Sequence, residues 1–597
     1  MVLVLGSALL LVFGASAWIH PIVVTAVLTI AWAQKSSWSF AFACSLVAQL
    51  LAVVLTGTIS PLLGLPFVPT AGALLTLLGM IGVFRLCSTG AIQLPSPRTL
   101  LWALVVSAGV AGFALVLSAR VVHGADLEWA MRNDSVWNLV SARFVLADGG
   151  IDQSAHSNPA PLTATLFALA MGVGRTEIVP AGLLEHDVTQ AAALWLFAAG
   201  TVALLAGLAC WHQAHAIGRA VRVLAAAGTA IFLLSWFVLG VALEFGFWNS
   251  TIVLVPLIAS WVAWLDWRSQ PLRALALLSA ASVVALATWA PAALVPASFA
   301  LVVGLGFATG SSRESGLSVR RRIIVVVALL APIPAYVLLV TLPDVRREGP
   351  ALAVEGGFIG MSPFHVAAVF VVFAIAAMRS PRTVRIGAFI LLVSGTAVIA
   401  YLLFQRRDAG RLWGYYPAKL SWLIVILMLV VLVPVLVALA SGFSHRTRGR
   451  GILLAAAVMS CYLLVLPVTP TYGWRTFLTP VALLEQRGNA QASVAAEELF
   501  GLAVPGSATI AMAFAGPAED ALINAWLLQL EAQNSRERIR DYSYVLDSES
   551  AQQVCDAIGA WSRPVRVVTR SKDAADRLLG LCNADFTVEV RPAPTTG

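Results

Sequence analysis

Charged side chains are scarce in this chain of 597 residues. Only 11% of the residues are Asp, Glu, Lys or Arg, whereas 59% are hydrophobic. Soluble domains carry about a quarter charged residues, so a water-soluble chain of this size would leave too much apolar surface exposed. The composition therefore predicts an integral membrane protein with the lipid bilayer as a partner.

Several motifs of catalysis and nucleotide binding are missing from the sequence. It contains no Cys/His set with zinc spacing, no phosphate-binding loop, no Gly-rich dinucleotide fingerprint and no serine nucleophile elbow. The net charge of +8 comes from short basic clusters between apolar segments, which is how a membrane protein sets its orientation. We therefore expect no nucleic-acid partner.

Uncharged segments of about 17–25 residues, or slightly fewer, recur through residues 1–469 and predict a polytopic transmembrane helical bundle of 13–15 spans. The basic clusters fall in alternate loops, which predicts a plasma (inner) membrane protein with a cytoplasmic N-terminus and an extracytoplasmic C-terminus. The predicted spans are 2–18, 20–34, 39–58, 68–84, 99–119, 190–210, 223–242, 250–265, 274–289, 291–308, 323–341, 363–378, 386–404, 420–440 and 452–468.

Residues 470–597 differ in kind and predict a small extracytoplasmic α/β domain. Strand patterns at 506–514, 542–546, 564–569 and 586–590 alternate with helix patterns at 519–532, 548–558 and 571–579. Cys555 and Cys582 are the only cysteines of this tail, and an isolated pair in an oxidising compartment predicts a disulfide bond.

The long outward loop 120–189 contains a helical pattern from Ser135 to Leu146. Its apolar residues recur at three- and four-residue spacing, which predicts an amphipathic helix along the membrane surface, with Gly149 and Gly150 at its end. Asp134 stands at the start of this helix and has two interpretations. It is either the helix N-cap or a general base that takes a proton from a sugar hydroxyl.

The loop 405–422 places four cations and four aromatic residues between two spans, on the side where the orientation rule predicts few cations. One interpretation is an interfacial aromatic belt with snorkelling cations. The other is a clamp for the phosphate of a polyprenyl-phosphate head group. The residues of this clamp are Lys419, Arg406, Arg407, Arg411, Tyr415 and Tyr416.

The pattern Asp-x-x-x-Asn-Leu-x-x-x-Arg-x-Val-Leu-x-x-Gly, from Asp134 to Gly149, resembles the GT-C superfamily of membrane glycosyltransferases. It is most similar to actinobacterial cell-envelope members of the arabinofuranosyl- and mannosyltransferase type. The resemblance implies transfer of arabinofuranose or mannose from a polyprenyl-phosphate donor to a cell-envelope glycan on the outer face of the membrane. It also implies that Asp134 is the catalytic base.

The chain departs from the family in two ways that affect the expected site. About four extra spans precede the acidic loop, and Asp126-Leu-Glu128 is only a loose substitute for an Asp-x-Asp motif. The metal site is therefore unknown, and a divalent cation stays open as a cofactor. Glu185-His186-Asp187 is interpreted as capping the next span. The further candidates for substrate contacts are Arg132, Asn138, Arg143, His156 and Glu244.

Two other classes of function remain as alternatives. A lipid-linked glycan transporter or flippase is disfavoured because the predicted spans carry almost no ionisable residues, which coupled transporters place at mid-membrane depth. A non-catalytic scaffold for envelope assembly would use the C-terminal domain to bind a partner.

Overall fold

The computed structural model is predominantly helical. It describes residues 1–14, 16–88, 134–151, 161–178, 182–215, 217–310, 318–347, 362–442, 495, 498–499, 507–531, 542, 546–561 and 563–592. The predicted spans 99–119 and 452–468 lie outside these residues, and every other predicted span falls on a helix.

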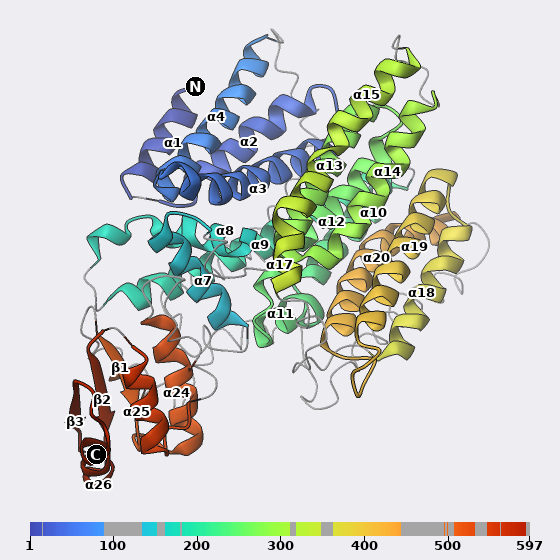
Figure 1. Ribbon diagram of the computed structural model, residues 1–597. Helices are drawn as coiled ribbons and strands as arrows, with labels where there is room; N and C mark the ends of the chain where they lie inside the picture. The colour runs from blue at the N-terminus through green and yellow to red at the C-terminus, as the bar shows by residue number, and fades with distance from the viewer. Residues whose placement is uncertain are drawn as a thin grey trace.

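The first four helices form a layer at one side of the bundle (Figure 1). α2 packs against α1, α3 and α4. Ser37 caps α3 by accepting a hydrogen bond from the Phe40 N–H. The bounds are α1 Val2–Val12, α2 Ile19–Ala33, α3 Trp38–Leu63 and α4 Phe67–Ser88.

The central and C-terminal parts of the bundle pack around α9, α12 and α13, which contact helices from both ends of the sequence. Large aromatic side chains fill this core, with Trp195, Trp248, Trp261 and Trp422 fully buried. The helices are α7 Ser135–Asp148, α8 Pro161–Gly172, η1 Arg175–Glu177, α9 Leu183–Gln213, α10 Arg219–Leu233, η3 Trp236–Gly240, α11 Val241–Glu244, α12 Trp248–Asp266, α13 Pro271–Trp289, η4 Ala290–Ala293, α14 Leu294–Ala308, α15 Val319–Leu330, α16 Pro332–Tyr336, η5 Val337–Thr341, α17 Leu342–Arg347, α18 Pro363–Met378, α19 Arg382–Gln405 and α20 Tyr415–Gly442.

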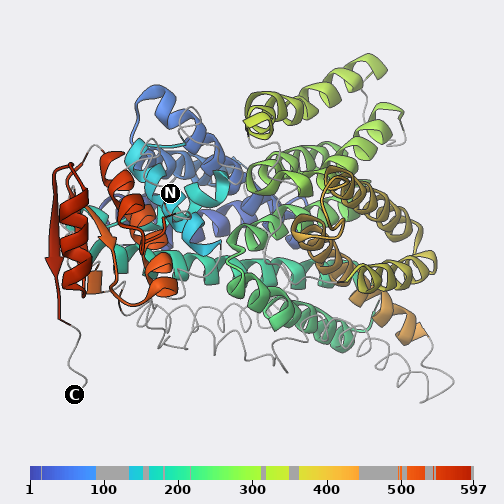
Figure 2. The same cartoon turned by 60° about the horizontal axis from the view of Figure 1, so that its bottom comes forward.

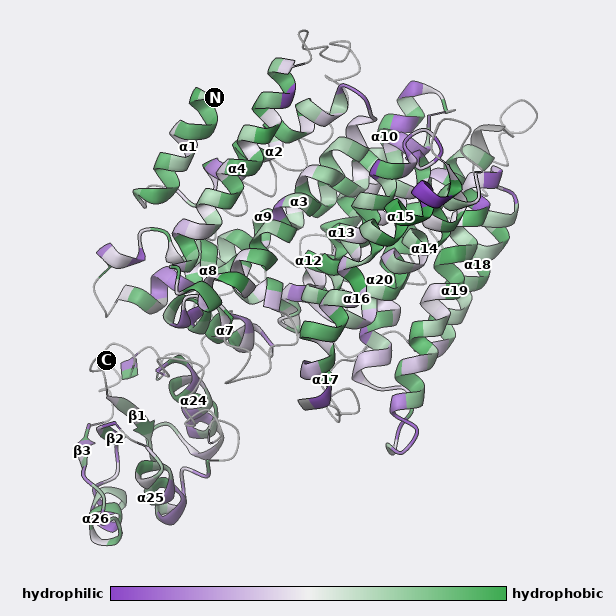
Figure 3. Cartoon of the chain, turned by 45° about the horizontal axis from the view of Figure 1, so that its top comes forward, coloured by the Kyte–Doolittle hydropathy of each residue, from purple (hydrophilic) through white to green (hydrophobic). Residues whose placement is uncertain are grey.

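Among the described residues, nine helical segments are long and apolar enough to cross a membrane, and four shorter apolar helices accompany them. Large hydrophobic side chains such as Phe84 and Phe389 lie exposed on the outside of the bundle. Figure 3 shows hydrophobic residues along the bundle helices and more hydrophilic ones in the C-terminal region. The exposed apolar surface fits a lipid bilayer, so the helical membrane-protein class predicted from composition is confirmed.

The C-terminal region contains a parallel three-stranded sheet in the order β1-β2-β3. Ile510, Val567 and Val588 are aligned across it. The disulfide bond joins Cys555 of α25 to Cys582, which follows α26, with the two Cα atoms 5.4 Å apart. The elements are β1 Ala508–Ala511, α24 Pro517–Leu530, α25 Ala551–Gly559, β2 Val565–Thr569, α26 Lys572–Leu581 and β3 Phe586–Val590.

Most of the predicted strand 542–546 falls on residues 543–545, which lie outside the described part of the chain. Its two end residues, Tyr542 and Leu546, belong to none of the three strands.

Helix α7 lies in a different place from the one that its sequence pattern suggests. The periodicity predicts a helix along the membrane surface, but α7 packs against α8, α4 and α9 and against α24 of the C-terminal domain. Figures 1 and 2 both show the C-terminal domain beside α7 and α8. Ser135, Ser141 and Ala142 are small and buried. Neighbouring helices therefore also pack against faces of α7 outside its row of large apolar residues.

The C-terminal end of α7 is tied to α3. The helix ends at Gly149, whose φ of 73° is a left-handed conformation that glycine adopts without steric cost. Gly150 follows with φ 156°, where a Cβ atom would collide with Pro61, and the Ile151 N–H donates to the Gly57 carbonyl at 2.9 Å. The two glycines therefore permit a close contact between α7 and α3.

Candidate functional site

Asp134 and the first turn of α20 meet at one end of the bundle. The Tyr415 hydroxyl donates a hydrogen bond of 2.6 Å to Asp134 Oδ2. Lys419 Nζ lies 3.9 Å from the same oxygen and 3.4 Å from the Tyr415 hydroxyl. The structure therefore brings the acidic residue and the cationic residue predicted for the site into one cluster.

The capping interpretation of Asp134 fails. Its side chain accepts no capping hydrogen bond from α7, and its backbone has a helical conformation rather than the extended one typical of an N-cap. The carboxylate instead turns to Tyr415 and Lys419, and half of its side-chain surface stays exposed. A carboxylate in this position is accessible to an incoming molecule.

Lys419 is almost fully buried among aromatic rings, with 3% of its side-chain surface exposed. Its ammonium group lies 3.7 Å from the centroid of the Phe247 ring, 5.6 Å from that of Trp289 and 5.4 Å from that of Tyr415. Aromatic faces stabilise a cation through their quadrupoles, and they also restrict where it can move. The cage thus directs this charge toward Asp134.

A turn between α11 and α12 fixes the start of α7. The Phe245 carbonyl accepts a hydrogen bond of 3.4 Å from the Asp134 N–H. The Asn138 side-chain amide donates to the Gly246 carbonyl at 3.1 Å and to the Asp134 carbonyl at 2.9 Å. Both hydrogen bonds of the Asn138 side chain therefore go to backbone carbonyls. Since Asn138 is only 7% exposed, it lies beneath the site rather than in a position to contact substrate.

The role of Phe247 was not predicted from the sequence. Its neighbour Glu244 was the predicted substrate contact, and the Glu244 side chain lies outside the described part of the structure. The ring of Phe247 contacts Lys419 instead and packs edge-on against Tyr415.

The arginines of the loop before α20 do not converge on the carboxylate. Arg406 is 1% exposed, and its Nε and Nη2 donate to the Arg411 carbonyl at 3.2 and 3.1 Å. Arg407 is exposed, lies over the Phe404 ring and pairs with Asp408. Arg411 is exposed, and Tyr416 packs edge-on against Tyr415. Arg406 therefore stabilises the conformation of the loop through the Arg411 carbonyl, and its burial keeps it from contacting a ligand.

Arg143 forms an ion pair away from the Asp134 cluster. Its Nε lies 3.4 Å from Asp187, and Arg175 pairs with both oxygens of the same carboxylate at 3.0 and 3.1 Å. At about 1.5 Å of rise per residue, α7 separates Arg143 from Asp134 by roughly 13 Å. Asp187 is fully buried and is no helix cap, so the predicted capping role is wrong and the residue holds α7 against α9.

Glu531 of the C-terminal domain lies close enough to Arg143 to interact with its charge. Burial raises the pKa of Glu531 to about 7, although the Thr509 N–H, at 2.6 Å, and the charges of Arg563 and Arg143 oppose the shift. Charge interactions of α7 thus reach the C-terminal domain through Arg143 and Glu531.

Some predicted site residues cannot be placed. Arg132, His156, Asp126 and Glu128 lie outside the described residues. Within the described part of the chain, no group of three His, Cys, Asp or Glu side chains could hold a metal ion. A metal site that uses Asp126 or Glu128 therefore stays a prediction.

No protein-family model, no curated protein and no solved structure matches this chain.

Proposed function

We propose that this chain is a membrane glycosyltransferase of the GT-C type that uses a polyprenyl-phosphate-linked sugar. Arabinofuranose or mannose is the favoured sugar, and a cell-envelope glycan on the outer face of the membrane is the acceptor. The observation that carries the proposal is the half-exposed Asp134 carboxylate 3.9 Å from the buried Lys419 ammonium, at one end of an apolar helical bundle.

Asp134 is the base in the proposed reaction. It accepts the proton of an acceptor hydroxyl while that oxygen bonds to the anomeric carbon of the donor sugar. The bond between that carbon and the donor phosphate oxygen breaks, and polyprenyl phosphate leaves with the bonding electrons. The Tyr415 hydroxyl, at 2.6 Å, orients the carboxylate for this transfer.

Lys419 stabilises the leaving phosphate. A phosphate gains negative charge as the sugar leaves, and a preorganised cation in a dry site is worth more than one in water. The aromatic cage keeps the ammonium buried and fixed. The exposed Arg407 and Arg411 lie in the loop that precedes α20 and are available to the donor head group from the water side.

The proposed orientation places this cluster outside the cytoplasm. Asp134 lies at the same end of the bundle as the C-terminal domain, which contains the disulfide bond (Figure 1). Disulfide bonds persist in oxidising compartments, which supports an extracytoplasmic position for this end. Polyprenyl-phosphate sugars suit that side because nucleotide sugars are absent there.

Mass spectrometry of envelope glycans from a deletion strain tests the proposal. A missing terminal sugar, restored by the wild-type gene but not by Asp134→Asn, is the expected result. Accumulation of a complete intermediate inside the cell would indicate a transporter. Unchanged glycans would indicate a scaffold, and either outcome would overturn the proposal.

A further inference from the structure

A cavity of about 840 Å³ lies between the N-terminal helices and α9. Its walls come mainly from α2, α3 and α9, with a few residues from α8 and α12 and one each from α4 and α10. Most of the lining side chains are aliphatic or aromatic. They include Ile22, Phe42, Leu46, Leu204 and Leu208. The cavity is thus suited to an apolar chain.

The cavity is long and runs along α9. Both Leu194 and His212 line it, and at about 1.5 Å per residue they are roughly 27 Å apart along this helix. The hydrocarbon core of a bilayer is about 30 Å thick, so one leaflet supplies about half of that. A chain that fills the cavity is therefore longer than the acyl chain of one leaflet.

One end of the cavity is polar and carries a cation. Arg222 stacks over the Trp211 ring at 3.9 Å, and its Nε donates to the Trp211 carbonyl at 2.6 Å. Among the described residues, nothing accepts a hydrogen bond from its two terminal nitrogens. A guanidinium that lines the cavity and is held by its Nε presents the forked donors that match a phosphate.

Among the described residues, the Asp266 carboxylate at this end already has hydrogen-bonding partners. Asp266 accepts a hydrogen bond from Ser37 at 2.5 Å and lies 2.9 Å from His212 Nε2. Ser37 and His212 themselves line the cavity. Asp266 therefore organises the polar end, while the Arg222 guanidinium is the group left to meet an anion.

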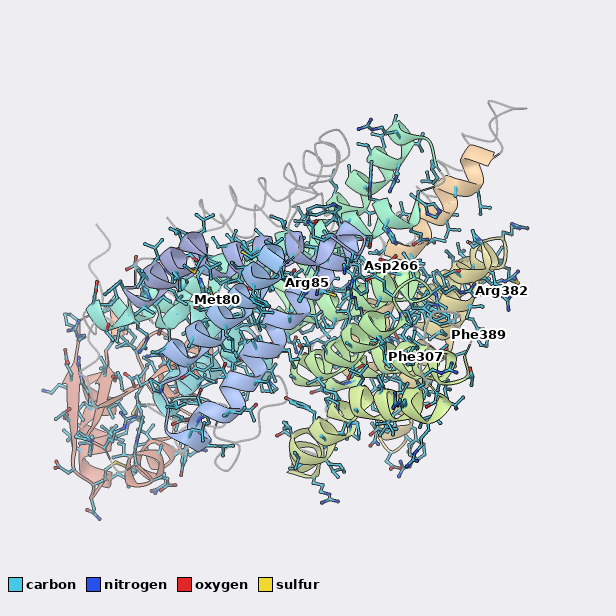
Figure 4. The ribbon with its side chains drawn as sticks, turned by 90° about the horizontal axis from the view of Figure 1, so that it is seen from above. Met80, Arg85, Asp266, Phe307, Arg382 and Phe389 are labelled. Carbon is cyan, nitrogen blue, oxygen red and sulfur yellow. A yellow bond between two sulfur atoms is a disulfide. The ribbon has the colours of Figure 1, made fainter. Side chains whose placement is uncertain are left out.

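This polar end lies far from the Asp134–Lys419 cluster. α12 begins at Trp248, next to Phe247, and ends at Asp266, about 27 Å away at the usual helical rise. Figure 4 views the bundle from above and labels Asp266 and Arg85.

We propose that this cavity binds one lipid phosphate whose apolar chain is longer than a leaflet, with its phosphate at Arg222. The length of the cavity favours an isoprenoid chain over a diacyl phospholipid, and the cation at one end sets the direction of the chain. The proposal does not depend on the glycosyltransferase assignment, because the head-group site is at the opposite end of the bundle from Lys419.

Binding of undecaprenyl phosphate to the delipidated full-length protein, measured by native mass spectrometry in detergent, tests the site. Farnesyl phosphate, undecaprenol and phosphatidylglycerol are the comparison probes. We expect undecaprenyl phosphate to bind at least tenfold more tightly than each of them. Equal binding of farnesyl phosphate or phosphatidylglycerol would overturn the chain-length argument, and equal binding of undecaprenol would overturn the phosphate contact.

Variants locate the bound lipid. Arg222→Gln should weaken undecaprenyl phosphate binding about tenfold, whereas the matched change Arg219→Gln, one turn earlier on the exposed side of α10, should not. Leu204→Trp narrows the cavity without touching a charge and should weaken binding similarly. Unchanged binding in both Arg222→Gln and Leu204→Trp would overturn the proposal.

A Lys419→Ala variant separates this site from the proposed donor site. Binding that depends on Arg222 should persist in Lys419→Ala. If Lys419→Ala abolishes all binding while Arg222→Gln leaves it intact, the lipid binds only beside Asp134 and the second site does not exist. Gel filtration of each variant checks that it is folded.

Discussion

Tyr415 and Asp134 are 281 positions apart in sequence, and the Tyr415 hydroxyl donates a 2.6 Å hydrogen bond to the Asp134 carboxylate. This contact joins the start of α20 to the start of α7. It uses the carboxylate that would otherwise cap α7, which leaves that helix without a side-chain cap. A residue that gives up a local stabilising role for a distant one is typical of a functional site.

Replacing Asp134 by Asn should reduce sugar transfer by about 10²–10⁴-fold, because the variant keeps the shape of the side chain and loses the proton acceptor. Asp148→Asn, at the other end of α7, is the matched control and should retain activity. The measurement is transfer of labelled sugar from a polyprenyl-phosphate donor by solubilised protein. Full activity in Asp134→Asn would disprove the assignment of the base.

Replacing Tyr415 by Phe removes one hydrogen bond to a charged group, which is worth about 1.5–3 kcal/mol. Transfer should therefore fall by roughly 10–100-fold if the bond orients the carboxylate in the transition state. Tyr416→Phe keeps the ring contact with Tyr415 and should have a smaller effect. Equal losses in the two variants would indicate that the effect is not specific to the hydroxyl of Tyr415.

Replacing Lys419 by Ala should raise the KM for the donor more than the KM for the acceptor, because the ammonium is proposed to hold the donor phosphate. The exposed Arg577 of the C-terminal domain, changed to Gln, serves as a control for general loss of positive charge. Initial rates over a grid of donor and acceptor concentrations separate the two constants. Similar increases for both substrates would contradict the phosphate contact.

Glu531 should make the stability of the C-terminal domain depend on pH. Burial raises the pKa of Glu531 from the ordinary 4.5 to about 7, so the folded state binds a proton more tightly than the unfolded state does. The contribution is fully present below pH 4.5 and is lost as the pH rises through 7. Glu531→Gln should therefore reduce the fall in thermal stability between pH 5 and pH 7.

The exposed Glu549, changed to Gln, is the matched control for this measurement. Its substitution should leave the pH dependence unchanged. If the unfolding temperature changes by the same amount between pH 5 and pH 7 in the wild type and in Glu531→Gln, this carboxyl makes no contribution.

Loss of the disulfide bond should destabilise the C-terminal domain. The bond closes a loop with a sequence separation of 27, for which chain entropy predicts about 3–4 kcal/mol. Cys555→Ser should lower the unfolding temperature, and reductant should have no further effect on that variant. Cys87→Ser, at an exposed free cysteine, should behave like the wild type, whereas two titratable thiols in the native C-terminal domain would refute the bond.

Charge placement in the sequence was sufficient to select Asp134, Lys419 and Tyr415. These residues interrupt an otherwise apolar chain, and a buried or half-buried charge in such a chain requires a partner. The same reasoning gave the helical bundle, because composition and span length are local properties. The pairing of Cys555 with Cys582 followed because that region offers no other cysteine.

The roles of Arg143, Arg406 and Phe247 could not be obtained in this way. Arg143 and Asp187 lie on different segments, and nothing local indicates that their helices pack side by side. Arg406 and Arg411 share one loop and look alike in sequence, yet only the first is buried. A phenylalanine beside a predicted span gives no sign that its ring will face a lysine, because tertiary packing decides this.

Helix α7 is held at three places by contacts that differ in chemistry. These are backbone hydrogen bonds at its start, the Arg143–Asp187 ion pair near its middle, and the glycine contact with α3 at its end. The position of the Asp134 carboxylate is consequently set when the protein folds. In the proposed reaction, neither substrate would need to organise the base on arrival, so binding energy from both is left for lowering the reaction barrier.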